Sequence, residues 1–243
     1  MEPQPTTTEA PLDRRIVFAL LYTAVALSVI EYWFLPFRAH ATGLPQRIPA
    51  SPDLAGALVW VASALVFFLL VPALIVRFGH RQRLSEIGFA PAGLRRHLPL
   101  YLLLYVLMLP ILYMVSRRPE FLAVYPFPPS ARTSLSALVV WELAYAAQFV
   151  ALESFFRGYL LFTCAARMGL LAVPVMVVPY TMIHFHKPFL ECLSAVGAGC
   201  VLGVLALRYR TFWGGALLHI LVAVTMDLLA VTRTGLLVWG TDR

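Results

Sequence analysis

Residues 151–162 read ALESFFRGYLLF, and this stretch decides how the rest of the chain is interpreted. It lies inside an apolar block, 134–166, that is long enough to cross about 30 Å of hydrocarbon at about 1.5 Å per residue. The block nevertheless carries Glu153 and Arg157. A charged side chain at the centre of a bilayer costs a few kcal/mol or more, so such residues face the inside of a bundle or a wet cavity. The stretch therefore predicts a membrane helix with a polar inner face.

The composition of the whole chain also indicates a membrane protein. Of its 243 residues, 60% are hydrophobic and 13% are charged, whereas soluble domains average about 45–50% and about 25%. The apolar residues come in blocks at about 15–37, 54–77, 97–116, 134–166, 170–186, 189–208 and 212–232. We therefore expect an all-α fold, a polytopic transmembrane helical bundle of about seven helices. Eight is the alternative, because the fourth block is long enough to break.

The blocks divide the chain into regions. Residues 1–13 are polar and rich in proline, and we expect a disordered cytoplasmic tail there. Residues 14–132 hold the N-terminal transmembrane helices, and within them 80–96 (HRQRLSEIGFAPAGLRR) reads as an amphipathic interfacial segment. The ionisable groups of interest lie in the core, 133–232, which a C-terminal tail follows at 233–243.

The net charge of +7 comes from 18 arginines and a single lysine. The arginines flank the apolar blocks, as lipid-headgroup anchors and topology signals do, so the bilayer is the expected partner and nucleic acid is not. With seven crossings, ten arginines fall on one side, which the positive-inside rule makes cytoplasmic: Arg14, Arg15, Arg77, Arg81, Arg83, Arg95, Arg96, Arg167, Arg208 and Arg210. The other side still holds Arg38, Arg47, Arg117, Arg118 and Arg132, so the bias is modest. This composition fits a multi-pass protein of a bacterial inner membrane.

Three further ionisable residues lie in apolar blocks. His184 stands in YTMIHFHKP, and His219 and Asp227 stand in ALLHILVAVTMDLLA. Taken alone, each histidine could equally be a hydrogen-bonded packing residue. Glu153 and Arg157 lie four residues apart on one helical face and could equally form an internal salt bridge. Polar groups on three separate membrane segments together favour a shared wet cavity.

Amide hydrolysis needs an activated water, a proton shuttle and donors for the oxyanion. Glu153 can deprotonate water with help from His184, while Arg157 holds the carboxylate ionised and oriented. His219 can donate to the oxyanion, and Asp227 can accept a hydrogen bond from a histidine. Glu153, His184 and His219 can equally bind a divalent metal such as zinc, although no HExxH helix is present. The residues alone leave metal-dependent and metal-free chemistry open.

The segments ESFFRGYLL, YTMIHFHKP and RYRTFWGGALLHILVAVTMDLLA together resemble the CPBP family of intramembrane proteases. This family comprises CAAX-processing and bacteriocin-processing enzymes, also called Abi or Rce1-like. The resemblance covers roughly residues 135–232. The hallmarks of the family are an EExxxR motif on one helix, an FxxxH motif on the next, and a histidine on the last core helix that is usually followed one turn later by Asn. Glu153 and Arg157 match the second Glu and the Arg, and His184 and His219 match the two histidines.

Three positions depart from the family pattern. Leu152 replaces the first Glu, so the chain carries a single-Glu variant of EExxxR; Tyr180 stands for the Phe of FxxxH, and Ala223 stands where the Asn is expected. Asp227 can substitute for the Asn from a turn further on. The resemblance implies an intramembrane endopeptidase, glutamate-type or metallo, that cleaves a peptide or protein substrate near the membrane.

Two other classes of function remain open at this stage. Leu152 and Ala223 also suit an inactive membrane scaffold or immunity protein of the same fold. A proton-coupled transporter can use the same ionisable residues as a relay. The chain shows no internal repeat, which counts against the transporter because many transporters are built from repeated halves.

Overall fold

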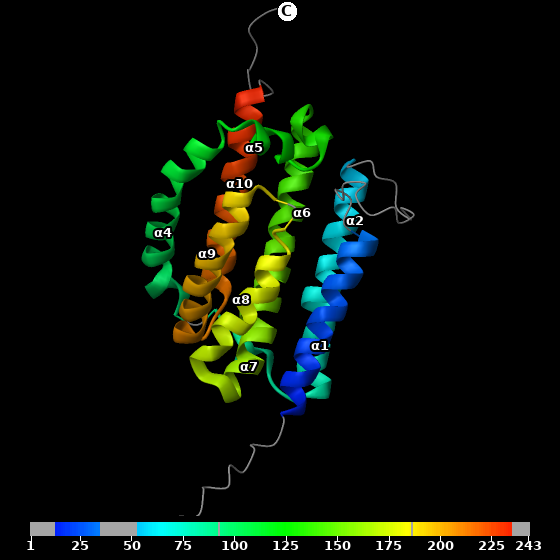
Figure 1. Cartoon of the computed structure of the whole chain (residues 1–243), viewed down its shortest axis with the longest axis vertical. Coiled ribbons are helices and arrows are strands. Elements are labelled where there is room, and N and C mark those ends of the chain that lie inside the picture. Colours follow the sequence, from blue (N-terminus) through cyan, green and yellow to red (C-terminus); the bar gives the residue numbers. More distant parts are fainter. Residues whose placement is uncertain (1–12, 35–52, 92, 186, 235–243) are drawn as a thin grey trace, which may run out of the picture.

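The computed structural model describes residues 13–34, 53–91, 93–185 and 187–234 (Figure 1). Every regular element in these ranges is a helix, which confirms the all-α expectation. The tails expected at 1–13 and 233–243 fall, apart from Asp13 and the last two helical residues, outside the described part of the chain.

The first two transmembrane segments form a hairpin of long helices that lie side by side (Figure 1). Asp13 begins the first helix by accepting the backbone N–H of Arg15 at 2.9 Å, and Asp53 begins the second by accepting that of Gly56 at 2.7 Å. Both helices contain π-helical stretches. Their parts are α1 (Arg14–Val29) and η1 (Ile30–Phe34), then α2 (Leu54–Ala64), η2 (Leu65–Leu70), α3 (Val71–Leu74) and η3 (Ile75–Gly79).

The segment expected at the interface, 80–96, contains one short 3-10 helix, η4 (Leu84–Ile87). Gly88 follows it with φ at 88°, a left-handed conformation that glycine adopts without strain. The carbonyl oxygen of Gly88 accepts the backbone N–H of Phe212 at 3.4 Å and the hydroxyl of Thr211 at 3.2 Å. These bonds attach the segment to the residues that precede the last helix.

The third membrane helix, α4 (Leu94–Val115), runs to the opposite end of the bundle, where the short α5 (Pro119–Val124) and the 3-10 helix η5 (Pro129–Arg132) follow. Figure 1 shows α5 lying across that end, near the top of the view. Tyr125, the residue after α5, is buried and donates its hydroxyl to Glu191 at 2.7 Å. The α5 segment is thus fastened to a helix of the core.

The core begins with one long helix made of α6 (Leu135–Glu153), the π-helical η6 (Ser154–Leu160) and α7 (Leu161–Met168). Every residue of η6 is buried, so the motif region lies at the centre of the bundle. The chain then turns at Gly169, whose φ is 55°, passes through η7 (Gly169–Leu171) and returns as α8 (Ala172–Met182). The helices α9 (Phe189–Tyr209) and α10 (Trp213–Thr234) complete the fold.

By length and composition, six helical runs of the described residues can cross a membrane. The sequence-based count of seven differs because the fourth and fifth blocks form one such run, Leu135–Met182, that doubles back. The returning part, α8, has only 11 residues, which is about 16 Å of helix and roughly half of a bilayer. The chain is an integral, multi-pass membrane protein.

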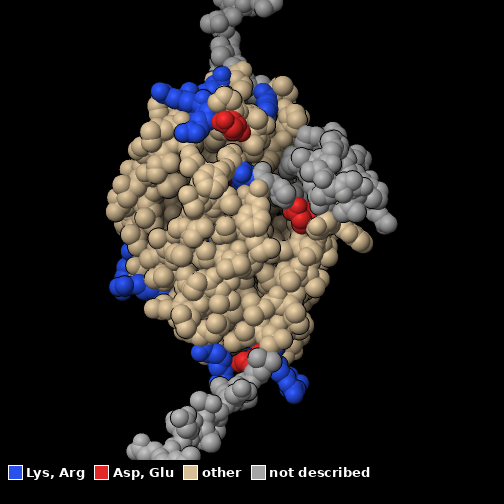
Figure 2. All heavy atoms as spheres, viewed as in Figure 1, with Lys and Arg blue, Asp and Glu red and all other residues tan. Residues whose placement is uncertain are grey.

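The connection from α8 to α9 lies beneath α5, short of that end of the bundle (Figure 1). Backbone outside a helix is tolerated at such depth where it is buried in protein or lines a cavity. Most charged side chains in Figure 2 lie toward the two ends of the molecule, and the surface between them is mostly uncharged. This distribution suits a protein whose uncharged surface contacts lipid.

Candidate active site

Glu153 is the last residue of α6 and is completely buried. Its Oε1 accepts Nη1–H of Arg157 at 2.5 Å, one turn further along the same helix. Its Oε2 has no hydrogen-bond partner among the described residues and lies against Gly215 of α10, where an added Cβ would stand only 2.8 Å away. The missing side chain of Gly215 therefore makes room for the carboxylate.

His219 of α10 contacts the same carboxylate oxygen, with Nδ1 at 3.0 Å from Oε1 of Glu153. A carboxylate oxygen accepts, so Nδ1 carries the proton and Nε2 carries the lone pair. The ring of Phe149, one turn before Glu153, packs on the imidazole with the ring centres 4.1 Å apart. Sixty-six residues separate Glu153 from His219, so the pair exists only because α6 and α10 pack together.

Arg157 is also completely buried, in η6. Its guanidinium carbon lies 3.9 Å from the ring centre of Tyr180 in α8, a cation–π contact that adds to the ion pair with Glu153. Arg157 thus joins the carboxylate to the helix that ends near His184. The expected orienting role for Arg157 is compatible with these contacts.

His184 follows α8 and is 6% exposed. Its Nδ1 lies 2.9 Å from the carbonyl oxygen of Tyr180, which can only accept, so this histidine also carries its lone pair on Nε2. No hydrogen bond or ion pair joins His184 to Glu153 in the described part of the chain. The two groups expected to act together on water are therefore not in direct contact.

A chamber of about 1050 Å³ lies beside these residues. Both His184 and His219 line it, whereas Glu153 and Arg157 stand behind its wall. The rest of the lining is largely apolar and comes from α4, α5, α6, α9 and α10, with Lys187 and Glu191 as polar groups near the connection between α8 and α9. A cavity of this size with a few convergent polar groups is the usual form of a binding site for a small or extended ligand.

Asp227 is buried in α10, but the structure places it apart from the histidines. Its Oδ2 accepts Nε1–H of Trp141 at 2.7 Å, and it is not among the residues that line the chamber. Glu142, the neighbour of Trp141 on α6, is a second acidic side chain that lies beside Asp227. Asp227 thus anchors α10 to α6 by a buried hydrogen bond.

The set Glu153, His184 and His219 was also considered for a divalent metal. Among the described residues, no group of three or more His, Cys, Asp or Glu side chains gathers closely enough to hold one. The carboxylate of Glu153 is instead occupied by Arg157 and His219. The residues present therefore do not fit a three-ligand metal site, and no step below passes through a metal.

Two features of the site were absent from the sequence-based prediction. Gly215 makes room for Glu153, a role that the sequence did not indicate. Lys187 lies 2.8 Å from Glu191, which also accepts the hydroxyl of Tyr125. The i, i+4 spacing of Lys187 and Glu191 was the available signal for their ion pair.

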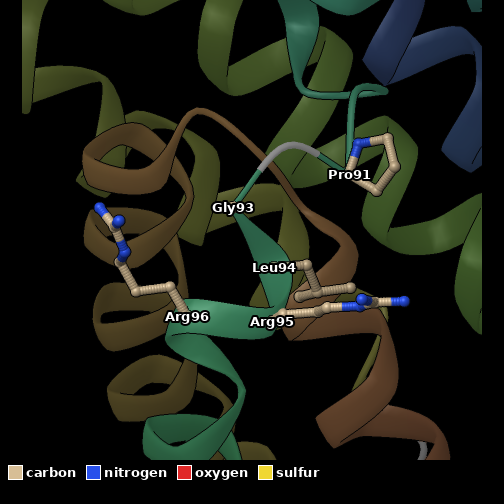
Figure 3. Close-up of a pocket in the computed structure, with 5 residues that line it drawn as sticks. All are labelled: Pro91, Gly93, Leu94, Arg95 and Arg96. Atoms are coloured by element: carbon tan, nitrogen blue, oxygen red, sulfur yellow. The ribbon is translucent and has the colours of Figure 1, made fainter.

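A second hollow lies at the start of α4, lined by Pro91 and residues 93–96. Figure 3 shows Arg95 and Arg96 extending in opposite directions from this turn. The hollow therefore offers no convergent polar groups, and we do not consider it a catalytic site.

Comparison with known families agrees with the motifs. Residues 134–225 match the family model described as type II CAAX prenyl endopeptidase, Rce1-like. The match contains Glu153, Arg157, His184 and His219 and ends just before Asp227. It confirms the resemblance inferred from the sequence for this part of the chain. No curated protein and no solved structure matches the chain.

Proposed function

The chain carries an Rce1-like core of the CAAX-protease type in residues 134–225, and from this premise we propose that it is an intramembrane endopeptidase. It hydrolyses a peptide bond inside the chamber beside Glu153, His184 and His219. The observation that carries the proposal is the buried contact of 3.0 Å between Glu153 and His219, which is formed by two distant helices at the wall of that chamber.

The proton of the attacking water passes to the pair of Glu153 and His219. Because Nδ1 of His219 donates to Glu153, its Nε2 is the basic atom at the chamber. The carboxylate behind it stabilises the imidazolium that forms when Nε2 takes the proton. This division of roles differs from the expectation that Glu153 meets water directly, because Glu153 is completely buried and does not line the chamber.

His184 presents a second lone pair on Nε2, since its Nδ1 donates to the carbonyl of Tyr180. A water molecule has two protons and can donate to both imidazoles at once, which leaves its oxygen lone pair for the substrate carbonyl. Arg157 holds the Glu153 carboxylate in position through the 2.5 Å ion pair. The imidazolium of His219 finally returns a proton to the leaving amine.

The single-Glu motif is compatible with activity in this arrangement. Leu152 is 7% exposed and belongs to the hydrophobic core, so the wall is closed without a second carboxylate. Burying an ion pair is costly, because desolvation offsets the Coulomb attraction. A scaffold or immunity protein without catalysis has no need for Glu153, Arg157 and two histidines at this depth, and we therefore favour an active, metal-free enzyme in a bacterial inner membrane.

The test is cleavage by the purified full-length protein in detergent. The probe is a quenched fluorescent peptide that ends in a farnesylated Cys-aliphatic-aliphatic-X sequence, chosen for the activity in the family's description. Glu153→Gln, His184→Ala and His219→Ala should each lose at least about 10²-fold in kcat/KM, the usual contribution of a positioned acid or base. Glu86→Gln, a change at an exposed residue remote from the chamber, is the matched control.

Cleavage by Glu153→Gln at the rate of the parent would remove the mechanism. Binding of the peptide without any product from the parent would instead identify the scaffold. Dialysis against a chelator should leave the rate unchanged, because the proposed steps use only side chains of this chain.

A further inference from the structure

The chamber extends from the two histidines toward one end of the bundle only. Apart from the parts of α6, α8 and α10 near the histidines, its walls come from α4 from Leu104 onward, from α5 and from α9 as far as Leu202. No residue of the loop between η3 and α4, of α7 or of the stretch 203–217 belongs to the lining. In Figure 1 those segments lie at the lower end, opposite α5. The reaction chamber therefore lies between the histidines and the α5 end of the bundle.

The opposite end is sealed by close packing of backbone. Nε1–H of Trp213 donates to the carbonyl of Phe89 at 2.9 Å. A Cβ on Gly158 would stand 3.1 Å from the carbonyl oxygen of Ile87, and a Cβ on Gly214 would stand 2.1 Å from the ring of Tyr101. A Cβ on Gly214 would overlap the ring of Tyr101, and a Cβ on Gly158 would be crowded by Ile87, so glycine at both positions permits this close packing. A peptide cannot reach Glu153 from this side without opening the packing.

The sealed end is also the arginine-rich end. Arg167 forms an ion pair with Asp13 at 3.1 Å, and Arg210 donates to the carbonyl of Glu86 at 3.3 Å. These contacts join the start of α1, the end of α7, the loop before α4 and the end of α9 at one face. This face carries the ten arginines that the sequence placed on one side. At the α5 end, the described arginines are Arg117, Arg118, Arg132 and Arg233, and the sequence predicts Arg38 and Arg47 on that side as well.

Short loops rich in arginine remain in the cytoplasm. We infer that the chamber is entered from the extracytoplasmic side, and that the substrate is a membrane-anchored peptide whose scissile part lies on that side. This inference rests on the proposed function for the cleavage itself. On this route the scissile part of the substrate does not come from the cytoplasm, because the arginine-rich end is the closely packed one.

The walls of the chamber suit such a peptide. Toward the lipid, Leu107 and Ile111 of α4 and Phe189 and Leu190 of α9 line the chamber and are 47–75% exposed. They can hold an apolar anchor that arrives laterally through the bilayer. Toward α5 the lining is polar and charged, with Arg118, Glu120, Lys187 and Glu191. That rim can solvate the part of the peptide that leaves the membrane.

The test combines labelling in intact cells with cleavage after purification. Cys192 and Cys200 are replaced by Ser, and the buried Cys164 is kept. Glu120→Cys then places a thiol at the rim of the chamber, and Ser85→Cys places one at an exposed position of the sealed end. Intact cells are treated with a bulky membrane-impermeant maleimide. Each protein is then purified, and cleavage of the farnesylated peptide is compared with that of the unlabelled sample of the same variant.

We expect Glu120→Cys to be labelled in intact cells and to lose at least about tenfold in rate on labelling. Ser85→Cys should be labelled only after the cells are permeabilised, and its rate should stay within about twofold. Labelling of Ser85→Cys in intact cells would overturn the orientation. A labelled Glu120→Cys that cleaves at its unlabelled rate would overturn the route. If no sample cleaves, the parent included, the proposed function fails, while the labelling still tests the orientation by itself.

Discussion

Replacement of Gly215 by alanine tests whether the position of the Glu153 carboxylate controls the reaction. The new Cβ would stand 2.8 Å from Oε2 and 3.5 Å from the carboxyl carbon of Glu153. The carboxylate is held at its other oxygen by Arg157 and His219, and no exposed space surrounds it. The whole group must therefore move, and both of those contacts must lengthen or bend.

The size of the effect follows from that geometry. Ordinary van der Waals contact begins at 3.4 Å, so the carboxylate must retreat by about 0.6 Å. Since a misplacement of about 1 Å can cost about 10²-fold in rate, we expect a loss of about 10- to 100-fold in kcat/KM. This corresponds to about 1.4–2.7 kcal/mol of transition-state stabilisation. Folding should survive, because alanine is favoured over glycine in a helix by about 0.5–1 kcal/mol.

The assay is cleavage of the farnesylated peptide in detergent together with thermal unfolding of the same samples. Gly197→Ala is the matched control, because it lies in α9 with no atom within 4 Å of an added Cβ. It should keep its activity while receiving the same gain in helix propensity. If Gly215→Ala and Gly197→Ala cleave at the same rate, the carboxylate does not depend on its contact with α10, and the reasoning is refuted.

The remaining predictions concern the contacts that support the site. Trp141→Phe removes the hydrogen-bond donor to Asp227 and leaves a buried carboxylate oxygen unpaired, so it should lower the free energy of unfolding by about 1–3 kcal/mol. The control Trp33→Phe, at an exposed tryptophan, should change the free energy of unfolding little. Equal effects of the two substitutions would contradict the anchoring role of Trp141. Tyr125→Phe removes the hydroxyl that the residue after α5 donates to Glu191, so amide hydrogen exchange in α5 should accelerate while exchange in α4 stays unchanged. Unchanged exchange in α5 would show that this hydrogen bond does not hold α5 in place.

The helices and the inward-facing groups could be predicted from the sequence because both follow from solvation. Apolar blocks of membrane length have few alternatives to helices in a bilayer, since every backbone group must be bonded within the segment. Ionisable residues inside such blocks must turn inward for the same reason. Glu153, Arg157 and His219 do gather in one buried cluster, and His184 lies at the wall of the adjoining chamber.

The contacts between those groups could not be predicted from the sequence. Glu153 was expected to act with His184, yet its partner is His219, because α6 packs on α10 where Gly215 leaves room. Asp227 was expected to assist a histidine, yet it accepts from Trp141. Helical spacing places residues on a face of one helix, and it contains no information on which other helix that face meets.

The apolar blocks and the charges inside them determined by themselves that this is a helical membrane protein with a polar interior, because hydrocarbon admits few other arrangements. Only the tertiary structure decided that Glu153 reaches the chamber through His219, and that the chamber lies toward the α5 end while the arginine-rich end is closely packed. Both depend on how closely helices remote in sequence approach, and the glycines at Gly158, Gly214 and Gly215 set that distance.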